Sequence, residues 1–239
     1  MSFRILYQDP FLVAIEKPSG FYVHPPEESI HKIRKNLSCL HSLRDQINSY
    51  LYPVHRIDRA TSGVLIFALD SQTAHSLCKM FEHQKIKKTY YCIIRGWINN
   101  SVTVDYPLKS ETNGEIKLSS LTSFQSIAQI EIQNSVGKYS TSRYSMIIAQ
   151  PKTGRKHQIR RHLHHISHPI IGDTIYGNSE HNHFFKKKLD LNGLLLKSYS
   201  IEFTHPNTGL PIKIKSKWNT TWHTIFDLFN ICPVNYLLT

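Results

Sequence analysis

The feature that most constrains the fold is a continuous apolar run, GVLIFAL at residues 63–69. The run has the length of a strand and lacks the polar alternation of a half-exposed strand, so it predicts a strand in the middle of a sheet. Shorter strand patterns surround it in the sequence. They lie at residues 5–25 (two strands around Asp9-Pro10, then a turn at Pro18-Ser19-Gly20), 90–94, 102–106, 126–132, 143–149, 194–203 and 212–215.

Helical patterns are fewer. Short helices are predicted near residues 41–50 and 218–229, and a helix over residues 72–84 has Ser71 as its cap and an apolar stripe of Ala74, Leu77, Cys78 and Phe81. A turn at residues 151–155 leads into a helix over residues 156–166, and further turns are predicted at residues 113–114 and 205–209. Strands outnumber helices without a regular strand-helix alternation, so the sequence predicts an α+β fold rich in antiparallel strands.

The composition is that of a globular protein, with 40% hydrophobic and 19% charged residues over 239 positions. No apolar run approaches the roughly 20 residues that span a bilayer, and residues 1–10 lack the pattern of a signal peptide. We therefore expect a soluble, cytoplasmic protein without a membrane partner.

The charge balance favours a polyanionic partner. There are 29 Lys and Arg residues against 17 Asp and Glu residues, which gives a formal charge of +12. A basic surface gains binding free energy when phosphates are neutralised and counterions are released. The alternative is a basic surface that serves only solubility. We rank a nucleic-acid partner ahead of this alternative.

Cysteine and histidine usage argues against a metal site. The four cysteines are scattered without a CxxC pair, which suggests neither a zinc site nor a disulfide framework, and two of them are interpreted as buried thiols. The 15 histidines include a cluster at His162, His164, His165 and His168, but no HExxH motif accompanies it. We predict no metal.

Three segments carry candidate chemistry. The first, HRIDRATSG at residues 55–63, places Asp58 between Arg56 and Arg59 immediately before the apolar strand. Neighbouring cations favour the ionised carboxylate, which would serve as a nucleophile or a base. The alternative is a turn aspartate paired locally with one of the two arginines, and this segment alone leaves both interpretations open.

The second segment, TGRKHQIRRH at residues 153–162, would form a dense basic face on a helix, with Lys156 and Arg160 four residues apart. Five cations lie between Lys152 and Arg161 with no acid among them, and they would repel one another unless an anion lay opposite. In the third segment, KKTYYCIIRG at residues 87–96, aromatic rings beside cations suit stacking on an unstacked base, although Tyr91 could equally be a core residue.

Taken together and in this order, these segments resemble the RluA-type family of RNA pseudouridine synthases. HRIDRATSG resembles the family's catalytic-aspartate motif HRLDxxTSG, and KKTYYCIIRG its K-x-Y-x-A-x-x-x-G strand, with Cys92 where alanine is common. EKPSGFYVHP at residues 16–25 resembles the opening motif. PKTGRKHQIRRHL at residues 151–163, followed by HPIIGD at residues 168–173, resembles the third motif.

The resemblance implies the pseudouridine synthase fold, a mixed and mainly antiparallel sheet with flanking helices and a central basic RNA-binding cleft. It implies one catalytic domain over residues 1–239 without the S4 RNA-binding domain that many relatives carry, and a monomer with no obligate protein partner. The implied activity is isomerisation of uridine to pseudouridine without a cofactor. Within the family, a member that modifies tRNA, in the T-stem near the acceptor junction, is the best match.

Site roles follow from the same resemblance. Asp58 matches the catalytic aspartate, Arg160 the arginine that pairs with it, and Tyr90 the tyrosine that stacks on the target base. Arg56 matches the residue implicated in displacing the base from its helix. The candidates for backbone contacts are Arg155, Lys156 and His157.

Three other functions compete with this interpretation of the sequence. An rRNA synthase of the same family and a non-catalytic RNA-binding protein that retains the fold would share most of these residues. A metal-dependent nuclease, suggested by the histidines, would stop working in chelator. Residues 101–139 have few features that can be interpreted, and substrate choice is a candidate role for them.

Overall fold

A computed structural model describes residues 2–24, 37–110 and 114–232. The chain forms two compact units. The first unit comprises Met1–Thr89 and Lys197–Ser216, and the second comprises Tyr90–Leu196 and Lys217–Thr239. Among the described residues, no helix is long and apolar enough to cross a membrane. The sequence prediction of a single catalytic domain stays a prediction.

The first unit is a mixed sheet in which most neighbouring strands are antiparallel. β2 (Leu12–Lys17) pairs antiparallel with β1 (Ile5–Gln8) and with β4 (Ser62–Ala68), and β4 also pairs with the short β3 (Tyr52–Pro53). β11 (Leu196–Thr204) lies parallel to β4, with Ser198 opposite Gly63, and pairs antiparallel with β12 (Pro211–Lys215).

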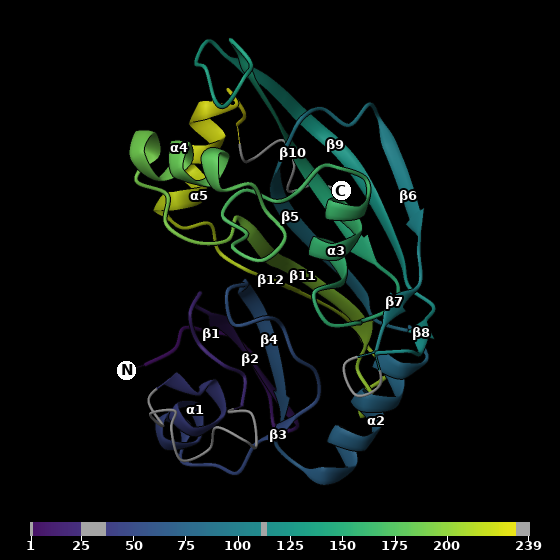
Figure 1. The fold of residues 1–239 in the computed structure, drawn as a ribbon. Coiled ribbons are helices and arrows are strands. Elements are labelled where there is room, and N and C mark those ends of the chain that lie inside the picture. The colour runs from purple at the N-terminus through teal and green to yellow at the C-terminus, as the bar shows by residue number, and fades with distance from the viewer. Residues whose placement is uncertain (1, 25–36, 111–113, 233–239) are drawn as a thin grey trace. The chain divides into compact units, whose positions relative to one another are not determined.

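The apolar run occupies β4, as predicted, because both faces of this strand are covered. Val64, Ile66 and Ala68 pack with residues of α2 (Ser71–Glu82) such as Leu77. Leu65 and Phe67 point the other way and pack with Leu40 and Leu43 of α1 (Cys39–Ile47). The strand therefore lies between two helices, visible as α1 and α2 in Figure 1. Because both of its faces are covered, its side chains do not alternate between apolar and polar.

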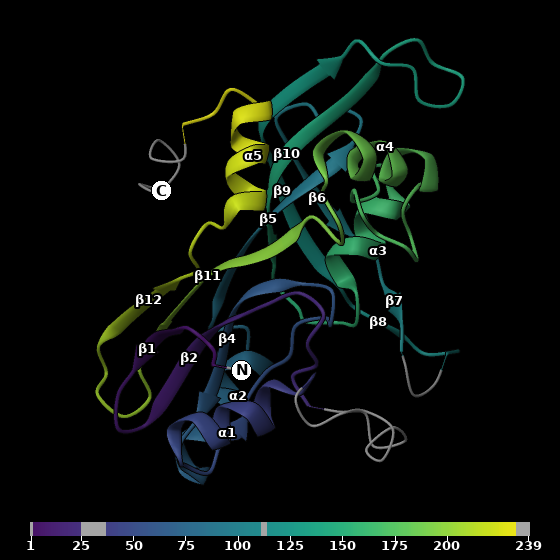
Figure 2. The same cartoon turned by 90° about the vertical axis from the view of Figure 1, so that its left-hand side faces the viewer.

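The second unit contains four antiparallel strands in the order β5-β10-β9-β6 (Figure 1 and Figure 2). These strands are β5 (Lys87–Arg95), β10 (Ser142–Pro151), β9 (Leu121–Ile132) and β6 (Ser101–Asp105), and β5 enters this unit at Tyr90. A separate short ladder joins β7 (Leu108–Lys109) to β8 (Lys117–Leu118). The helices are α3 (Gln158–His165), α4 (Ser179–Leu189) and α5 (Thr220–Leu228).

Most predicted strands are confirmed within a few residues, whereas helix starts differ. α2 begins at Ser71, and its cap is Asp70, whose carboxylate accepts hydrogen bonds from the Thr73 backbone N–H at 2.8 Å and hydroxyl at 2.7 Å. Cys78, placed in the apolar stripe by the sequence, is exposed. The predicted turn at residues 113–114 falls partly outside the described residues.

Two cysteines are buried thiols: Cys39 at the start of α1 and Cys92 in the middle of β5. Burial raises the pKa of the Cys39 thiol to about 11 and also raises that of Cys92, so both are uncharged at neutral pH. They pack as small apolar side chains.

Candidate active site and RNA-binding residues

The turn that carries Asp58 is held by a buried lysine. Lys17, at the end of β2, is 0% exposed, and its Nζ donates to the carbonyl oxygens of Arg59 at 3.0 Å and Thr61 at 2.8 Å. A third bond goes to the Pro18 carbonyl at 2.9 Å. Asp58 itself is half-buried, and its carbonyl accepts the Thr61 N–H at 3.0 Å. One ammonium group therefore fixes the backbone of this turn.

The charge of Lys17 is also part of the site. Burial lowers the pKa of Lys17 to about 8, while the negative charge of Asp58 acts in the opposite direction and favours the ammonium. Lys17 consequently stays protonated at neutral pH. The sequence placed this lysine in the opening motif without assigning it a role.

A second set of bonds joins the Pro18-Ser19-Gly20 turn to the same segment. The Ser19 hydroxyl donates to the Ala60 carbonyl at 2.7 Å. The guanidinium of Arg59 donates through Nε to the Gly20 carbonyl at 2.9 Å and lies 4.9 Å from the centre of the Tyr22 ring. Arg59, one of the two candidate local partners of Asp58, is thus directed toward residues 20–22, whereas Arg56 is exposed.

His55, the first residue of the motif, anchors the segment to β4. Its Nε2 accepts the backbone N–H of Ile66 at 3.0 Å, and its ring stacks on Phe81 with centroids 4.7 Å apart. Desolvation, assisted by the charge of Lys88, lowers the pKa of His55 to about 3. The ring is therefore neutral at physiological pH and carries its proton on Nδ1, which leaves Nε2 as the acceptor.

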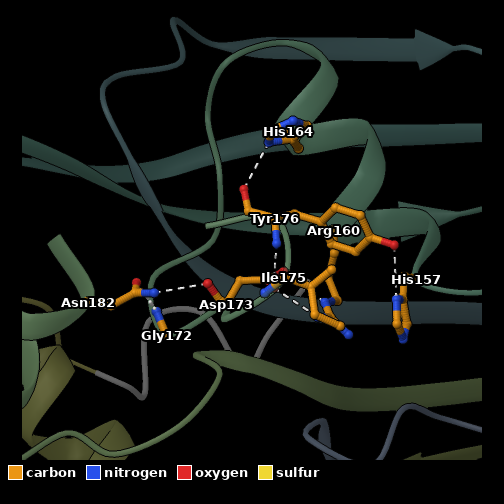
Figure 3. A network of polar contacts seen from close by, with 8 residues as sticks. All are labelled: His157, Arg160, His164, Gly172, Asp173, Ile175, Tyr176 and Asn182. Carbon is orange, nitrogen blue, oxygen red and sulfur yellow. Dashed lines mark hydrogen bonds and ion pairs between the residues drawn. The ribbon is translucent and has the colours of Figure 1, made fainter. Parts of the chain in front are cut away.

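In the second unit, Arg160 forms a buried bidentate ion pair with Asp173 (Figure 3). The Arg160 Nε lies 2.7 Å from Oδ2, and a terminal guanidinium nitrogen lies 2.8 Å from Oδ1. Arg160 is 5% exposed and Asp173 1% exposed, so both charges are removed from water and depend on each other.

Asp173 also orders the loop that follows it. Its Oδ1 accepts the backbone N–H groups of Ile175 at 2.9 Å and Tyr176 at 3.0 Å. Burial alone would raise the pKa of the Asp173 carboxyl, but the guanidinium of Arg160 and the two backbone donors outweigh burial and lower it. Asp173 is thus the counter-charge of one cation in the cation-rich segment, Arg160.

His157 and Tyr176 complete this network (Figure 3). The Tyr176 hydroxyl lies 3.2 Å from His157 Nδ1, and the Tyr176 ring lies 5.3 Å from the guanidinium carbon of Arg160. The Tyr176 carbonyl is 2.8 Å from His164 Nδ1. His157 adopts a left-handed backbone conformation with φ of 53° immediately before α3.

The predicted continuous basic helical face is wrong in detail, because α3 begins at Gln158 and not at Lys156. The buried Gln158 side chain accepts the Arg155 N–H at 3.0 Å and the Thr153 hydroxyl at 2.7 Å, which holds the preceding turn outside the helix. Lys156 is therefore not a helical neighbour of Arg160, which is buried. Arg155 and Lys156 are exposed, and the Arg155 Nε donates to the Ser119 carbonyl at 3.3 Å.

Tyr90 and Tyr91 have different environments on β5. Tyr91 is 2% exposed and packs edge-on against Trp218 at 5.1 Å, which confirms the core interpretation for this residue. Tyr90 is half-buried and lies opposite Ala149 of β10. Because side chains alternate along a strand, Tyr90 points to the face opposite that of Tyr91.

The clustered histidines make contacts with backbone and hydroxyl groups. His162 is buried between the Thr122 hydroxyl and the Tyr106 carbonyl, both at 3.0 Å, and His168 lies 2.9 Å from the Arg95 carbonyl. Within the described parts of the chain, no three His, Cys, Asp or Glu side chains are placed to hold a metal ion.

The comparisons with known proteins match this arrangement. Residues 11–165 match the model of the RNA pseudouridylate synthase family, and the chain belongs to that family. It is an RNA pseudouridine synthase, an isomerase.

Individual relatives are similar along almost the whole chain. A protein of Vibrio cholerae named tRNA pseudouridine synthase C is 39% identical over 95% of this chain and 95% of its own length. A protein of the same name from Haemophilus ducreyi is 41% identical over 96% of each.

Solved structures confirm the fold. Human RNA Pseudouridylate Synthase Domain Containing 4 covers 95% of this chain with a TM-score of 0.70 and 22% identity. Human RNA Pseudouridylate Synthase Domain Containing 1 covers 91% with the same TM-score and 21% identity. The pseudouridine synthase fold predicted from the sequence is therefore confirmed.

Proposed function

We propose that this chain isomerises a specific uridine of tRNA, in the T-stem near the acceptor junction, with Asp58 as the essential residue. The observation that carries the tRNA assignment is the 39% identity, over 95% of both chains, to a protein named for that activity. The Lys17-held turn supports the role of Asp58, because it keeps a carboxylate beside a buried ammonium group.

The reaction breaks the bond between C1′ of the ribose and N1 of uracil and forms a bond between C1′ and C5. The C5 proton is lost and N1 gains a proton, so the product is an isomer and no oxidant or reductant is consumed. The proposal accordingly includes no cofactor. Asp58 would act as a nucleophile toward the ribose or the base, or as a base that removes a ribose proton to give a glycal-like intermediate.

The remaining candidate residues have supporting roles in the proposal. Tyr90 stacks on the target base and assists the loss of the C5 proton, and Arg160 keeps Asp58 ionised. The bidentate pair with Asp173 supports this role because it fixes the plane and position of the guanidinium. Arg56 assists base displacement, which costs a few kcal/mol of stacking and pairing. Arg155, Lys156 and His157 contact the RNA backbone.

The test is a pseudouridine map of unmodified tRNA transcripts after incubation with the purified protein in chelator. We expect modification at one T-stem position, its loss in Asp58→Ala and Asp58→Asn, and full activity in Asp227→Ala, an exposed aspartate of α5 that serves as control. Tyr90→Phe should retain tRNA affinity, since it keeps the ring, and lose turnover.

Other outcomes favour the competing functions. Modification of rRNA fragments with no change in any tRNA would identify an rRNA synthase of the same family. Tight tRNA binding without pseudouridine in either RNA would leave a non-catalytic RNA-binding protein. The proposal also includes a cytoplasmic monomer, which light scattering and cell fractionation would check.

A further inference from the structure

An exposed tyrosine in the second unit is stacked on a histidine. Tyr106 directly follows β6 and is 39% exposed, which is among the larger exposures of the hydrophobic side chains. Its ring lies parallel to that of His165 in α3, with centroids 3.7 Å apart and an interplanar angle of 17°. Because His165 covers one face of the ring, the exposed surface of Tyr106 lies on its other face and edge.

This ring is held in place from several directions. The Tyr106 N–H donates to the Ser120 carbonyl at 3.1 Å, and its carbonyl lies 3.0 Å from Nε2 of the buried His162. Burial lowers the pKa of His162, so the neutral ring donates from Nε2 and accepts at Nδ1 from the Thr122 hydroxyl at 3.0 Å. His162 and His165 are three residues apart on α3, so one helix face holds both the backbone and the ring of Tyr106.

Three cations lie near the stacked pair in the sequence or on the same helix. Arg161, also on α3, donates through Nη1 to the Lys109 carbonyl at 3.2 Å. Lys109 and Lys117 are exposed register partners across β7 and β8, and like charges directly opposite each other destabilise a strand pair. Asp105, Glu111 and Glu115 are the acids in the neighbouring sequence. A bound polyanion would relieve the repulsion between the two lysines.

We propose that these residues form an RNA-contact surface for nucleotides other than the one that is isomerised. In this Tyr106 surface, an unstacked base lies on the open face of Tyr106 and the adjoining phosphates contact Lys109, Lys117 and Arg161. The inference rests on the proposed RNA substrate. An ordered aromatic ring flanked by cations is the combination that binds unpaired nucleotides, since every base has a face that can stack.

The primary test is the affinity for an unmodified tRNA transcript, measured by fluorescence anisotropy. Tyr106→Ala should weaken binding by about tenfold, since stacking on one base is lost, whereas Tyr106→Phe should bind as the unchanged protein does. The matched control is Tyr139→Ala, which removes a tyrosine of the same unit that is 54% exposed and lies beside Lys138. A thermal melt of each variant checks that the fold is kept.

The cations have a separate signature in the salt dependence of binding. Lys109→Gln and Lys117→Gln should each reduce the slope of log affinity against log salt concentration by about one, as expected for one lost phosphate contact. Lys187→Gln, which changes an exposed lysine on α4, should leave the slope as it is. A folded Tyr106→Ala protein that binds tRNA as tightly as Tyr139→Ala would overturn the proposal.

The experiment separates this inference from the proposed function. Binding does not require isomerisation, so a protein that forms no pseudouridine but loses tRNA affinity in Tyr106→Ala would refute the function and keep the surface. Where isomerisation is observed, Tyr106→Ala should raise KM by about tenfold and leave kcat at saturating tRNA unchanged. An unchanged KM would refute the surface and keep the function.

Discussion

Arg160 and Asp173 form a buried, bidentate ion pair in the second unit. Both side chains are buried, and the two parallel hydrogen bonds match the planar guanidinium to the carboxylate. Each charge therefore depends on the other for its solvation. The pair also links α3 to the loop that carries Ile175 and Tyr176.

Asp173→Asn should lower the free energy of unfolding by about 3–5 kcal/mol, because it removes the buried negative charge to which Arg160 makes two hydrogen bonds. Chemical denaturation at pH 7 measures the change. Asp190→Asn is the matched control, since Asp190 is exposed and its left-handed conformation, with φ of 49°, suits asparagine. Equal stability of the two variants would contradict the role assigned to the ion pair.

Sequence reasoning reached some of these residues and missed others for a physical reason. The motifs led to Asp58, Tyr90 and Arg160, and the excess of cations over residues 152–161 indicated that an anion was needed. The anion that pairs with Arg160 is Asp173, which lies in a loop that returns to α3. No local pattern in the sequence encodes the path of that loop. Lys17 was missed similarly, because a lysine before a proline gives no sign that it will be buried.

At the scale of elements, the pattern of apolar residues predicted where most strands lie. The same pattern did not predict the residue at which each helix begins. Asp70 and Ser71 are both good cap residues, and the choice between them depends on where the chain leaves β4. The start of α3 is set by the Gln158 side chain, which bonds the preceding turn. The sequence did not predict α4, since its adjacent Phe184 and Phe185 break the helical period of apolar residues.

Gly63 is the glycine on which the strand arrangement of the first unit most depends. Its φ is +115°, and a Cβ there would collide with the backbone of Ser198, its partner across the parallel pairing of β4 and β11. Gly63→Ala should therefore cost about 4 kcal/mol or more, at the severe end of single substitutions. Thermal melting against Gly154→Ala checks this, because a Cβ on Gly154 would meet no atom within 4 Å.

If Gly63→Ala melts at the same temperature as Gly154→Ala, the close approach of β4 to β11 is incorrect. Loss of soluble protein in Gly63→Ala alone would agree with the collision. The glycine of the TSG motif would then be required by sheet geometry, independently of any contact with RNA.

At the scale of the whole molecule, two desolvated histidines make stability depend on pH. Desolvation lowers the pKa of His55 to about 3 and that of His181, bonded to the Tyr144 hydroxyl at 2.8 Å, to about 4. On unfolding, both regain the ordinary histidine pKa near 6.5. Between these values the unfolded chain binds more protons than the folded chain, so stability rises with pH across this window and is lost as pH falls.

The free energy of unfolding should therefore decrease from pH 6.5 toward pH 4, by up to about 1.4 kcal/mol per pH unit for each histidine. Urea denaturation at several pH values measures the slope. His55→Asn and His181→Asn should each make the slope shallower, and His223→Asn, at an exposed position of α5, should leave it unchanged. Identical slopes in all proteins would refute the assignment of neutral, desolvated histidines at positions 55 and 181.

The discontinuity of the first unit has a consequence for biosynthesis. Residues 1–89 leave the ribosome early, yet β11 and β12, which complete their sheet, lie in residues 197–216. Until those residues emerge, β4 lacks its parallel neighbour and Glu16 lacks Lys197, to which it is bonded at 2.6 Å. The nascent chain must therefore keep an open sheet edge while the main stretch of the second unit is translated, which makes this interval the period of greatest exposure to aggregation.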